Sequence, residues 1–158
     1  MVKSRRIARI KVMSVLYAYE ITKEPLDKIK KDLLTDFDDA EKLEFSKELI
    51  SKVTENVKSL DISIRKKINN WEYHRVALLD KIILRMGLAE ILYFPEIPPK
   101  VTINEAIDLG KDYSTANSGK FINGVLDSIL HDLKKSNKLN KKGRGLLDLD
   151  KKTNADEK

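Results

Sequence analysis

The stretch from Val76 to Phe94 is the longest apolar segment of the chain, and it constrains the fold more than any other feature. Read as a helix, it places hydrophobic residues around most of its circumference, which is typical of a helix surrounded by other helices. It is interrupted by four charged residues, Asp80, Lys81, Arg85 and Glu90, which argue against a membrane span. Prolines at positions 95, 98 and 99 stop the helix. The sequence therefore predicts one central helix with others packed around it.

The remaining apolar residues also follow the spacing of three and four positions that marks one face of a helix. Glycine and proline are scarce before residue 94, and no alternation of apolar and polar residues indicates a strand. We predict an all-α fold of about six or seven helices in two small packed helical bundles. The expected helices run from Ser4 to about Thr22, from Pro25 to about Thr35, from about residue 40 to Val57, from Leu60 to Ile68, from Arg75 to Phe94, and onward from Thr102 and from Ser118.

A chain of 158 residues has the size of one domain and can bury a core without disulfides, and it contains no cysteine. We predict a single helical domain over residues 1–133, with subbundles over about 4–70 and 71–133. Residues 134–158 are rich in lysine and poor in apolar side chains, so we expect them to be disordered. No signal peptide is visible, and we expect a soluble cytoplasmic protein.

Positive charge is concentrated at the two ends of the chain. Residues 1–11 contain five basic and no acidic side chains, and residues 134–158 contain nine basic and four acidic ones. Because the whole chain has a net charge of +6, residues 12–133 carry a net charge of −4. Clustered cations are what phosphate contacts require, which favours a nucleic-acid partner. The alternative is that both ends are simply solvated.

The segment from Ile103 to Asp127 reads as two helices around a polar turn. Thr102 and Glu105 have the spacing of a capping box, so the first of these helices should begin near Thr102. Ser118 should cap the second. Gly124 lies inside that helix, where glycine costs about 1 kcal/mol relative to alanine. We therefore expect another helix to approach the backbone closely at Gly124.

These residues resemble the NusB family of transcription antitermination factors. The family's C-terminal signature is matched by Ile103-Asn104-Glu105-Ala106 and by Ser118-Gly119-Lys120-Phe121-Ile122-Asn123-Gly124-Val125-Leu126-Asp127. Its arginine-rich first helix is matched by Arg5-Arg6-Ile7-Ala8-Arg9 with Leu16-Tyr17, and the central helix resembles Val76 to Leu92. The resemblance covers residues 4–133 but is a match of pattern alone from Thr22 to Asn70. One departure is Gly110, which replaces an ordinary helix former and should weaken its helix by roughly 1 kcal/mol.

The resemblance implies a function as well as a fold. NusB-like proteins pair with NusE, a ribosomal small-subunit protein, and the pair binds boxA, a single-stranded element of ribosomal RNA transcripts. The resemblance thus implies an RNA-binding protein that joins an RNA polymerase antitermination complex and promotes read-through. The alternative is a protein-only helical scaffold, and the sequence leaves monomer and homodimer open.

The first candidate site is on the first helix. Arg5, Arg6 and Arg9 fall within an arc of about 100° on a regular helix, so we expect one outward cationic face that contacts RNA. Tyr17 has nearly the same angular position as Arg6 and can stack on an unpaired base. The alternatives are arginines that only keep the helix soluble and a tyrosine at the edge of the core.

The second candidate site is at the start of the last helix. Free N–H groups and the helix dipole favour a phosphate there, and Lys120 adds a charge. Phe121 alone would be a core residue, but the resemblance implies that Lys120 and Phe121 border the RNA surface. Asn117 precedes the cap, where some relatives carry an acid, and we include it as an RNA contact.

Two acids on the central helix, Asp80 and Glu90, are the candidates for contacting the basic NusE partner, because unpaired buried carboxylates are costly. The alternative is intramolecular pairing with Arg75 or Arg85. We expect no catalysis, cofactor or metal, since the two histidines, His74 and His131, belong to no catalytic or metal-binding motif.

Overall fold

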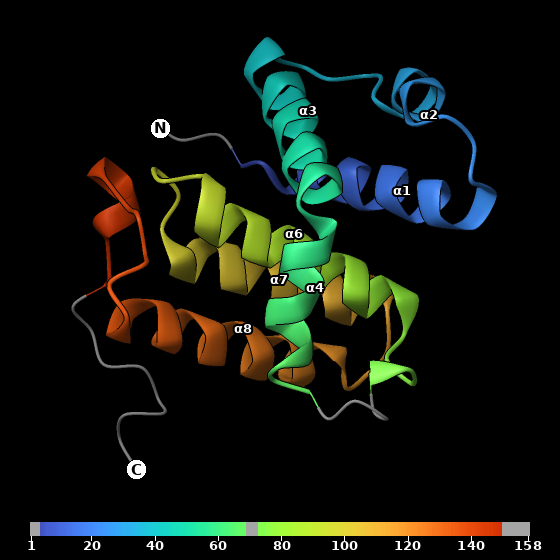
Figure 1. The fold of residues 1–158 in the computed structure, drawn as a ribbon. Helices are drawn as coiled ribbons and strands as arrows, with labels where there is room; N and C mark the ends of the chain where they lie inside the picture. The colour runs from blue at the N-terminus through green and yellow to red at the C-terminus, as the bar shows by residue number, and fades with distance from the viewer. Residues whose placement is uncertain (1–3, 69–72, 150–158) are drawn as a thin grey trace. The chain divides into compact units, whose positions relative to one another are not determined.

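The structure is a computed structural model that describes residues 4–68 and 73–149. Within these ranges it contains seven α-helices, one short 3₁₀ helix and no strand, which confirms the all-α prediction (Figure 1). The helices are α1 (Arg6–Thr22), α2 (Leu26–Leu33), α3 (Ala40–Glu55), α4 (Val57–Arg65), α6 (Leu78–Tyr93), α7 (Pro99–Tyr113) and α8 (Ser118–Lys135), followed by the 3₁₀ helix η1 (Gly143–Leu146). Trp71 and Glu72, expected to lie in a connection, are outside the described residues.

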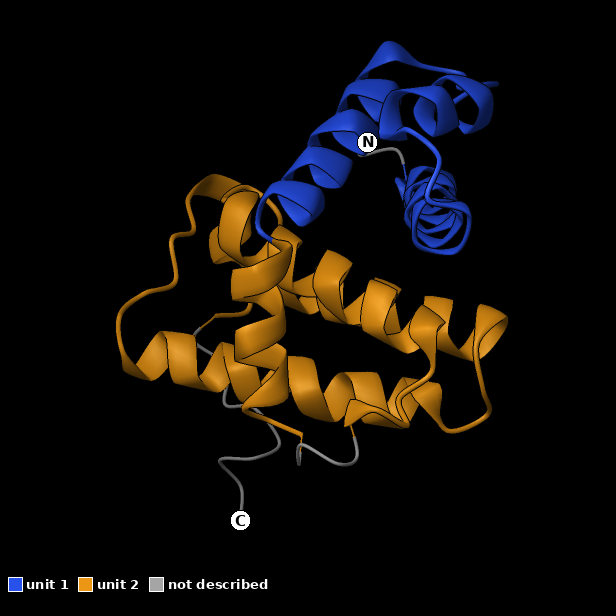
Figure 2. Cartoon of the chain, turned by 45° about the vertical axis from the view of Figure 1, so that its right-hand side comes forward, with its two compact units in different colours: residues 1–56 blue, residues 57–158 orange. Residues whose placement is uncertain are grey.

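The chain forms two compact units, residues 1–56 and 57–158 (Figure 2). The sequence placed the division near residue 70, which was wrong. The helix α4 belongs to the second unit because it runs across α6 and α8 and packs against both. Its apolar side chains Leu60 and Ile64 are 0% and 1% exposed. The division therefore falls between two consecutive helices.

In unit 1, α1 packs against α2 and α3. The inner face of α1 buries Ala8, Val12, Val15 and Leu16, as its spacing predicts. Asp39 caps α3, since its Oδ1 accepts hydrogen bonds from the backbone N–H groups of Glu41 (2.8 Å) and Lys42 (3.3 Å). A carboxylate at this position satisfies free helix N–H groups and faces the positive end of the dipole.

In unit 2, α6 is the central helix. Ten of its sixteen residues are buried, and it contacts α4, α7 and α8. Arg85 on α6 and Asp61 on α4 form a two-point ion pair, with N–O distances of 2.8 and 3.0 Å. Burial alone would lower the pKa of Arg85, but hydrogen bonds to Asp61 and Tyr73 hold this pKa above its ordinary value. The pair fixes α4 on the central helix.

The start of α7 differs from the prediction. The helix begins at Pro99, three residues before the expected cap, because proline fits the first turn, where no N–H partner is needed. Thr102 is therefore inside the helix and 1% exposed, and its hydroxyl donates a 3.1 Å hydrogen bond to Glu90 Oε1 on α6. The predicted capping residue instead links α7 to the central helix.

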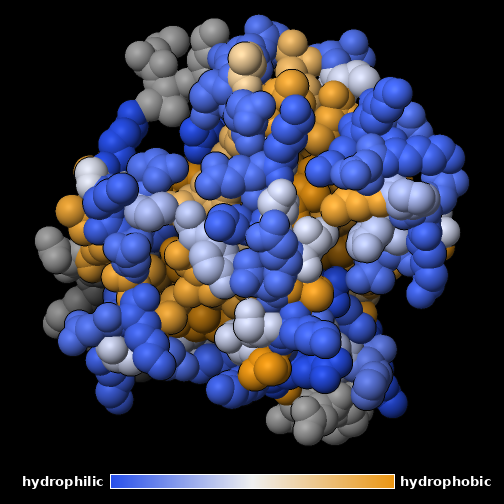
Figure 3. Space-filling view, turned by 45° about the horizontal axis from the view of Figure 1, so that its top comes forward, coloured by the Kyte–Doolittle hydropathy of each residue, from blue (hydrophilic) through white to orange (hydrophobic). Residues whose placement is uncertain are grey.

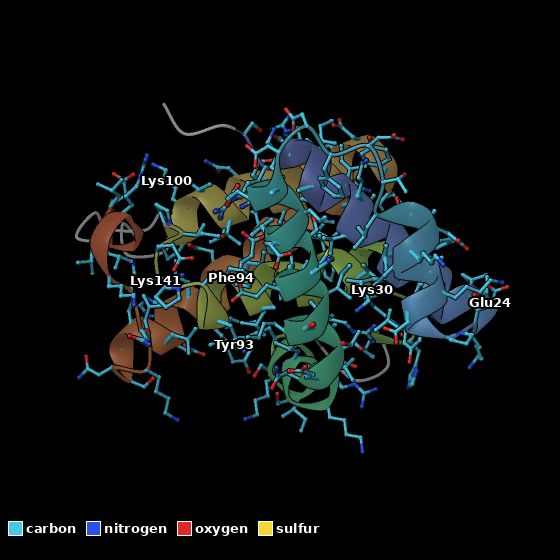
Figure 4. All side chains as sticks on the ribbon, turned by 90° about the horizontal axis from the view of Figure 1, so that it is seen from above. Glu24, Lys30, Tyr93, Phe94, Lys100 and Lys141 are labelled. Atoms are coloured by element: carbon cyan, nitrogen blue, oxygen red, sulfur yellow. The ribbon has the colours of Figure 1, made fainter. Side chains whose placement is uncertain are left out.

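Disorder was expected from residue 134, but residues 134–149 are ordered. The helix α8 continues to Lys135, and the segment after it returns to the end of α6. Lys141 Nζ donates to the carbonyl oxygens of Phe94 (2.9 Å) and Glu90 (3.3 Å), beside the end of α6 (Figure 4). Lys142 N–H donates to the Pro95 carbonyl (3.1 Å). The part of the predicted tail at 150–158 lies outside the described residues.

Burial also changes the acidity of this segment. Desolvation lowers the pKa of Lys141 to about 8, although Glu90 and Glu96 act in the opposite direction.

Among the described residues, no helix is both long enough and apolar enough to cross a membrane.

Candidate nucleic-acid interface

The three arginines of α1 do not form one outward face. Arg9 is only 4% exposed, because Phe45 of α3 covers it with the guanidinium 5.3 Å from the ring centre. Arg5 lies 4.4 Å from the same ring and also pairs with Glu41. Arg6 alone is exposed. The prediction of three exposed cations was wrong for Arg9, since α3 supplies a ring that the spacing of α1 cannot reveal.

Exposed aromatic and aliphatic side chains accompany Arg6 on the outer face of α1. Tyr17 is 41% exposed, so it does not fill the edge of the core. Ile7 and Ile21 are 59% and 57% exposed on the same helix. Figure 3 shows that the visible face of the molecule has hydrophobic residues between hydrophilic ones. Arg6 and Tyr17 therefore both lie at the surface of α1.

In unit 2, the corner between α7 and α8 is held by Ser118, the first residue of α8. Its hydroxyl does not cap α8 as expected; the N-cap residue is Asn117, which makes no side-chain capping bond. The Ser118 hydroxyl accepts a hydrogen bond from the Thr115 N–H (3.0 Å) and donates one to Asp80 Oδ2 on α6 (3.0 Å). The corner is thus tied to the first turn of the central helix.

Two glycines allow α7 and α8 to approach each other closely at this corner. A Cβ placed on Gly110 would lie 2.6 Å from Ile122 Cδ1 and 3.3 Å from Ser118 Cβ. A Cβ on Gly119 would lie 2.9 Å from two side-chain carbons of Lys111. Gly124, where the close approach was expected, has no atom within 4 Å of its hypothetical Cβ, so that expectation was wrong. The close packing therefore requires glycine at position 110, where the sequence departs from the ordinary helix former of the family.

The residues predicted to contact RNA lie at this fixed corner. Asn117 and Lys120 are exposed and Phe121 is half-buried. No acidic residue occupies the first turn of α8, so the helix dipole and the lysine act together on an approaching anion. The side chain of Phe121 is partly accessible beside them. This arrangement suits a phosphate followed by a base.

The two acids predicted to contact a protein partner are not at the surface. Asp80 is 6% exposed and bound to Ser118, and Glu90 is 2% exposed and bound to Thr102. Each accepts a hydrogen bond from a hydroxyl group of a neighbouring helix, Asp80 from α8 and Glu90 from α7. They were predicted to contact a partner because unpaired buried carboxylates are costly, and the spacing of α6 cannot show that neighbouring helices offer hydroxyl donors. A direct contact with a partner is therefore not supported.

The candidate residues fall into two groups, Arg5, Arg6, Arg9 and Tyr17 in unit 1 and Asn117, Lys120 and Phe121 in unit 2. Sequence reasoning missed the link from Asp80 to Ser118, although an acid in the first turn of an apolar helix was a signal for it.

Within residues 4–68 and 73–149, no three side chains of the metal-ligating types gather as a metal site would require.

Comparisons with known proteins agree with the fold and the motifs. Residues 6–131 match the NusB family. A transcription antitermination protein NusB from Chloroherpeton thalassium is 44% identical over 151 residues, covering 94% of this chain and 72% of the relative. The corresponding protein from Salinibacter ruber is 42% identical over 149 residues, covering 93% of each chain.

Solved structures give the same result. T. maritima NusB matches with a TM-score of 0.77 and 34% identity, covering 84% of this chain and 94% of that one. A structure of the antitermination factors NusB and NusE in complex with dsRNA matches with a TM-score of 0.75 and 25% identity, covering 84% and 99%. The chain therefore belongs to the NusB family of transcription antitermination proteins.

Proposed function

We propose that this chain is an RNA-binding antitermination factor that binds a boxA-like single strand of ribosomal RNA transcripts together with a NusE protein. In this role it joins an antitermination complex on RNA polymerase and promotes read-through. Its mechanism is assembly without bond chemistry, and its place of action is the cytoplasm. The matched structure of NusB and NusE with dsRNA supports both the protein and the RNA partner.

The observation that carries this proposal is the fixed corner between α7 and α8. Lys120 is exposed in the first turn of α8, where the free N–H groups also attract an anion. The bond from Ser118 to Asp80 and the close packing at Gly110 and Gly119 hold the corner in place before any ligand arrives. A preformed site loses little conformational entropy on binding.

In unit 1, the helix α1 carries its own candidate contacts, which differ in how accessible they are. Arg6 and Tyr17 are accessible, so they act as direct contacts with a phosphate and a base. Arg5 reaches RNA only by exchanging its exposed ion pair with Glu41 for a phosphate, and such surface pairs contribute about 0 to 1 kcal/mol. Arg9 supports Phe45 and does not contact RNA.

The test is a salt titration of RNA binding. Each single-strand phosphate contact contributes about −0.7 to the slope of log affinity against log salt, so Lys120→Gln should reduce the magnitude of that slope by about 0.7. Lys100→Gln removes one exposed cation from the first turns of α7 and is the matched control. If the titrations of Lys120→Gln and the parent coincide, the corner is not an RNA site.

Measurements with and without NusE separate the proposal from its alternative. RNA affinity that appears or rises with NusE supports an RNA-binding adaptor. No affinity for a boxA-like strand under either condition would favour the protein-only scaffold. A duplex of the same sequence is included, because the matched complex contains dsRNA. If the duplex binds more strongly than the single strand, double-stranded RNA is the ligand of this protein.

A further inference from the structure

A second group of cations surrounds Tyr73 in unit 2, outside the two candidate sites described above. Tyr73 is 5% exposed, and its ring is approached by Arg65 from the end of α4 and by Lys81 from the first turns of α6. The guanidinium carbon of Arg65 and the Nζ of Lys81 are each 4.5 Å from the ring centre. The two charges are therefore no more than twice that distance apart.

Neighbouring cations have carboxylate partners, whereas these two do not. Lys67 pairs with Asp132, and Arg85 pairs with Asp61. Among residues 4–68 and 73–149, neither Arg65 nor Lys81 forms an ion pair with a carboxylate. Lys66, His74 and Arg75 are exposed beside them. Over the described residues 61–68 and 73–85 the sequence has six basic and two acidic side chains, an excess of positive charge.

Simple solvation does not explain this arrangement well. Arginine and lysine have long flexible side chains that lose rotamer entropy when they are held in one place, and like charges repel. A cation–π contact orients each of them at the ring. Holding two cations at one buried ring produces a local site for an anion, because a bound anion removes the repulsion between them.

The position of this group relates it to the corner between α7 and α8. Lys81 directly follows Asp80, whose carboxylate accepts the hydrogen bond from Ser118 at the start of α8. The first turn of α6 therefore lies between the Tyr73 group and the beginning of α8. Lys81 and the start of α8 are thus linked within unit 2 through Asp80 and Ser118.

We propose that Arg65 and Lys81, supported by Tyr73, bind backbone phosphates of the RNA and extend the RNA-binding surface of unit 2 beyond the corner. The inference rests on the proposed function and adds residues that it does not include. Tyr73 is too buried to stack on a base, so the contacts are with phosphate groups alone. The site strengthens binding to every sequence equally and carries no base preference.

The experiment compares the double variant Arg65→Gln/Lys81→Gln with the control Lys100→Gln/Lys138→Gln, which removes two exposed cations elsewhere in unit 2. Fluorescence anisotropy of a labelled boxA-like strand is measured between about 0.05 and 0.3 M salt. Loss of two phosphate contacts should reduce the magnitude of the slope by about 1.4 and weaken binding roughly 25-fold at 0.1 M salt. A charge-preserving variant, Arg65→Lys/Lys81→Arg, should keep most of the parental affinity.

Each outcome decides the inference. A reduced slope in the double variant but not in the control, with the same loss for a scrambled strand, supports it. Coinciding titrations of the double variant and the parent, or an equal loss in the control, would overturn it while leaving the proposed function intact. Intact RNA binding with lost binding of the protein partner would also overturn it and assign the group to that partner. A parent chain without RNA affinity would overturn the proposed function as well.

Discussion

Two glycines in helix interiors should respond in opposite ways to the same substitution. Gly124→Ala adds a methyl group where no atom lies within 4 Å, so it should stabilise the protein by about 1 kcal/mol through helix propensity. Gly110→Ala gains the same propensity but places the methyl group 2.6 Å from Ile122 Cδ1 and 3.3 Å from Ser118 Cβ. Such overpacking costs about 1 to 3 kcal/mol.

The propensity gain cancels in the comparison, so the difference in unfolding free energy between the two variants measures the overpacking alone, about 1 to 3 kcal/mol. Urea unfolding followed by circular dichroism gives both values, provided that the slopes with denaturant agree. If Gly110→Ala stabilises the protein as much as Gly124→Ala does, the close approach of α7 and α8 is not rigid. The account of the corner would then be refuted.

Three further predictions concern the second unit. Because the folded-state pKa of Lys141 is lowered to about 8, the unfolded chain binds more protons between this pH and about 10.5, and stability should rise with pH across that window. The full pKa shift corresponds to about 3 kcal/mol of unfolding free energy, and partial exposure of Lys141 reduces this to about 1 kcal/mol. The unfolding free energy of the parent should therefore rise by about 1 kcal/mol from pH 7.5 to pH 10, and that of Lys141→Met should not. In Gly145→Ala the added Cβ would lie 1.8 Å from the Pro95 carbonyl oxygen, so the Lys142 N–H should lose its hydrogen-exchange protection; unchanged protection would show that the segment adapts. Asp61→Ala leaves Arg85 without its ion-pair partner and should destabilise by roughly 3 kcal/mol in urea, and Asp61→Leu/Arg85→Met should recover most of that loss.

Features that depend on the local sequence were predicted well. The apolar stretch from Val76 to Phe94 identifies the central helix, because burial on nearly all sides requires hydrophobic residues on nearly all sides. The start of α3 after Asp39 could also be predicted, since a capping carboxylate acts on N–H groups only two and three residues away.

Features that depend on distant neighbours could not be predicted. Arg9 has the angular position of an exposed arginine, yet it is buried against Phe45, thirty-six residues later in the chain. Thr102 and Ser118 have the character of capping residues, but Glu90 and Asp80 on α6 take their hydroxyl hydrogens. Hydroxyl groups serve a local cap or a distant acceptor equally well, and the packing of three helices decides between them.

The C-terminal segment shows the limit of composition as a guide to order. Its lysines indicate a solvated tail, yet Lys141 uses a long side chain to reach two carbonyl groups at the end of α6. These carbonyls already accept backbone hydrogen bonds, Glu90 from the Phe94 N–H and Phe94 from the Ile97 N–H (both 3.1 Å), and Lys141 adds a further donor to each, which compensates for ordering the segment. Composition shows that Lys141 is charged, but it cannot show that backbone carbonyls lie within reach of its side chain.

The corner between α7 and α8 also has a calorimetric consequence. Its hydrogen bonds and close glycine contacts are already in place in the free protein, so binding there requires no local folding. Coupled folding adds a large negative heat-capacity change because it buries apolar surface beyond the interface. Titration calorimetry of RNA on this chain at several temperatures should therefore show a heat-capacity change no larger than the contact area requires, with ion release as the dominant favourable entropy.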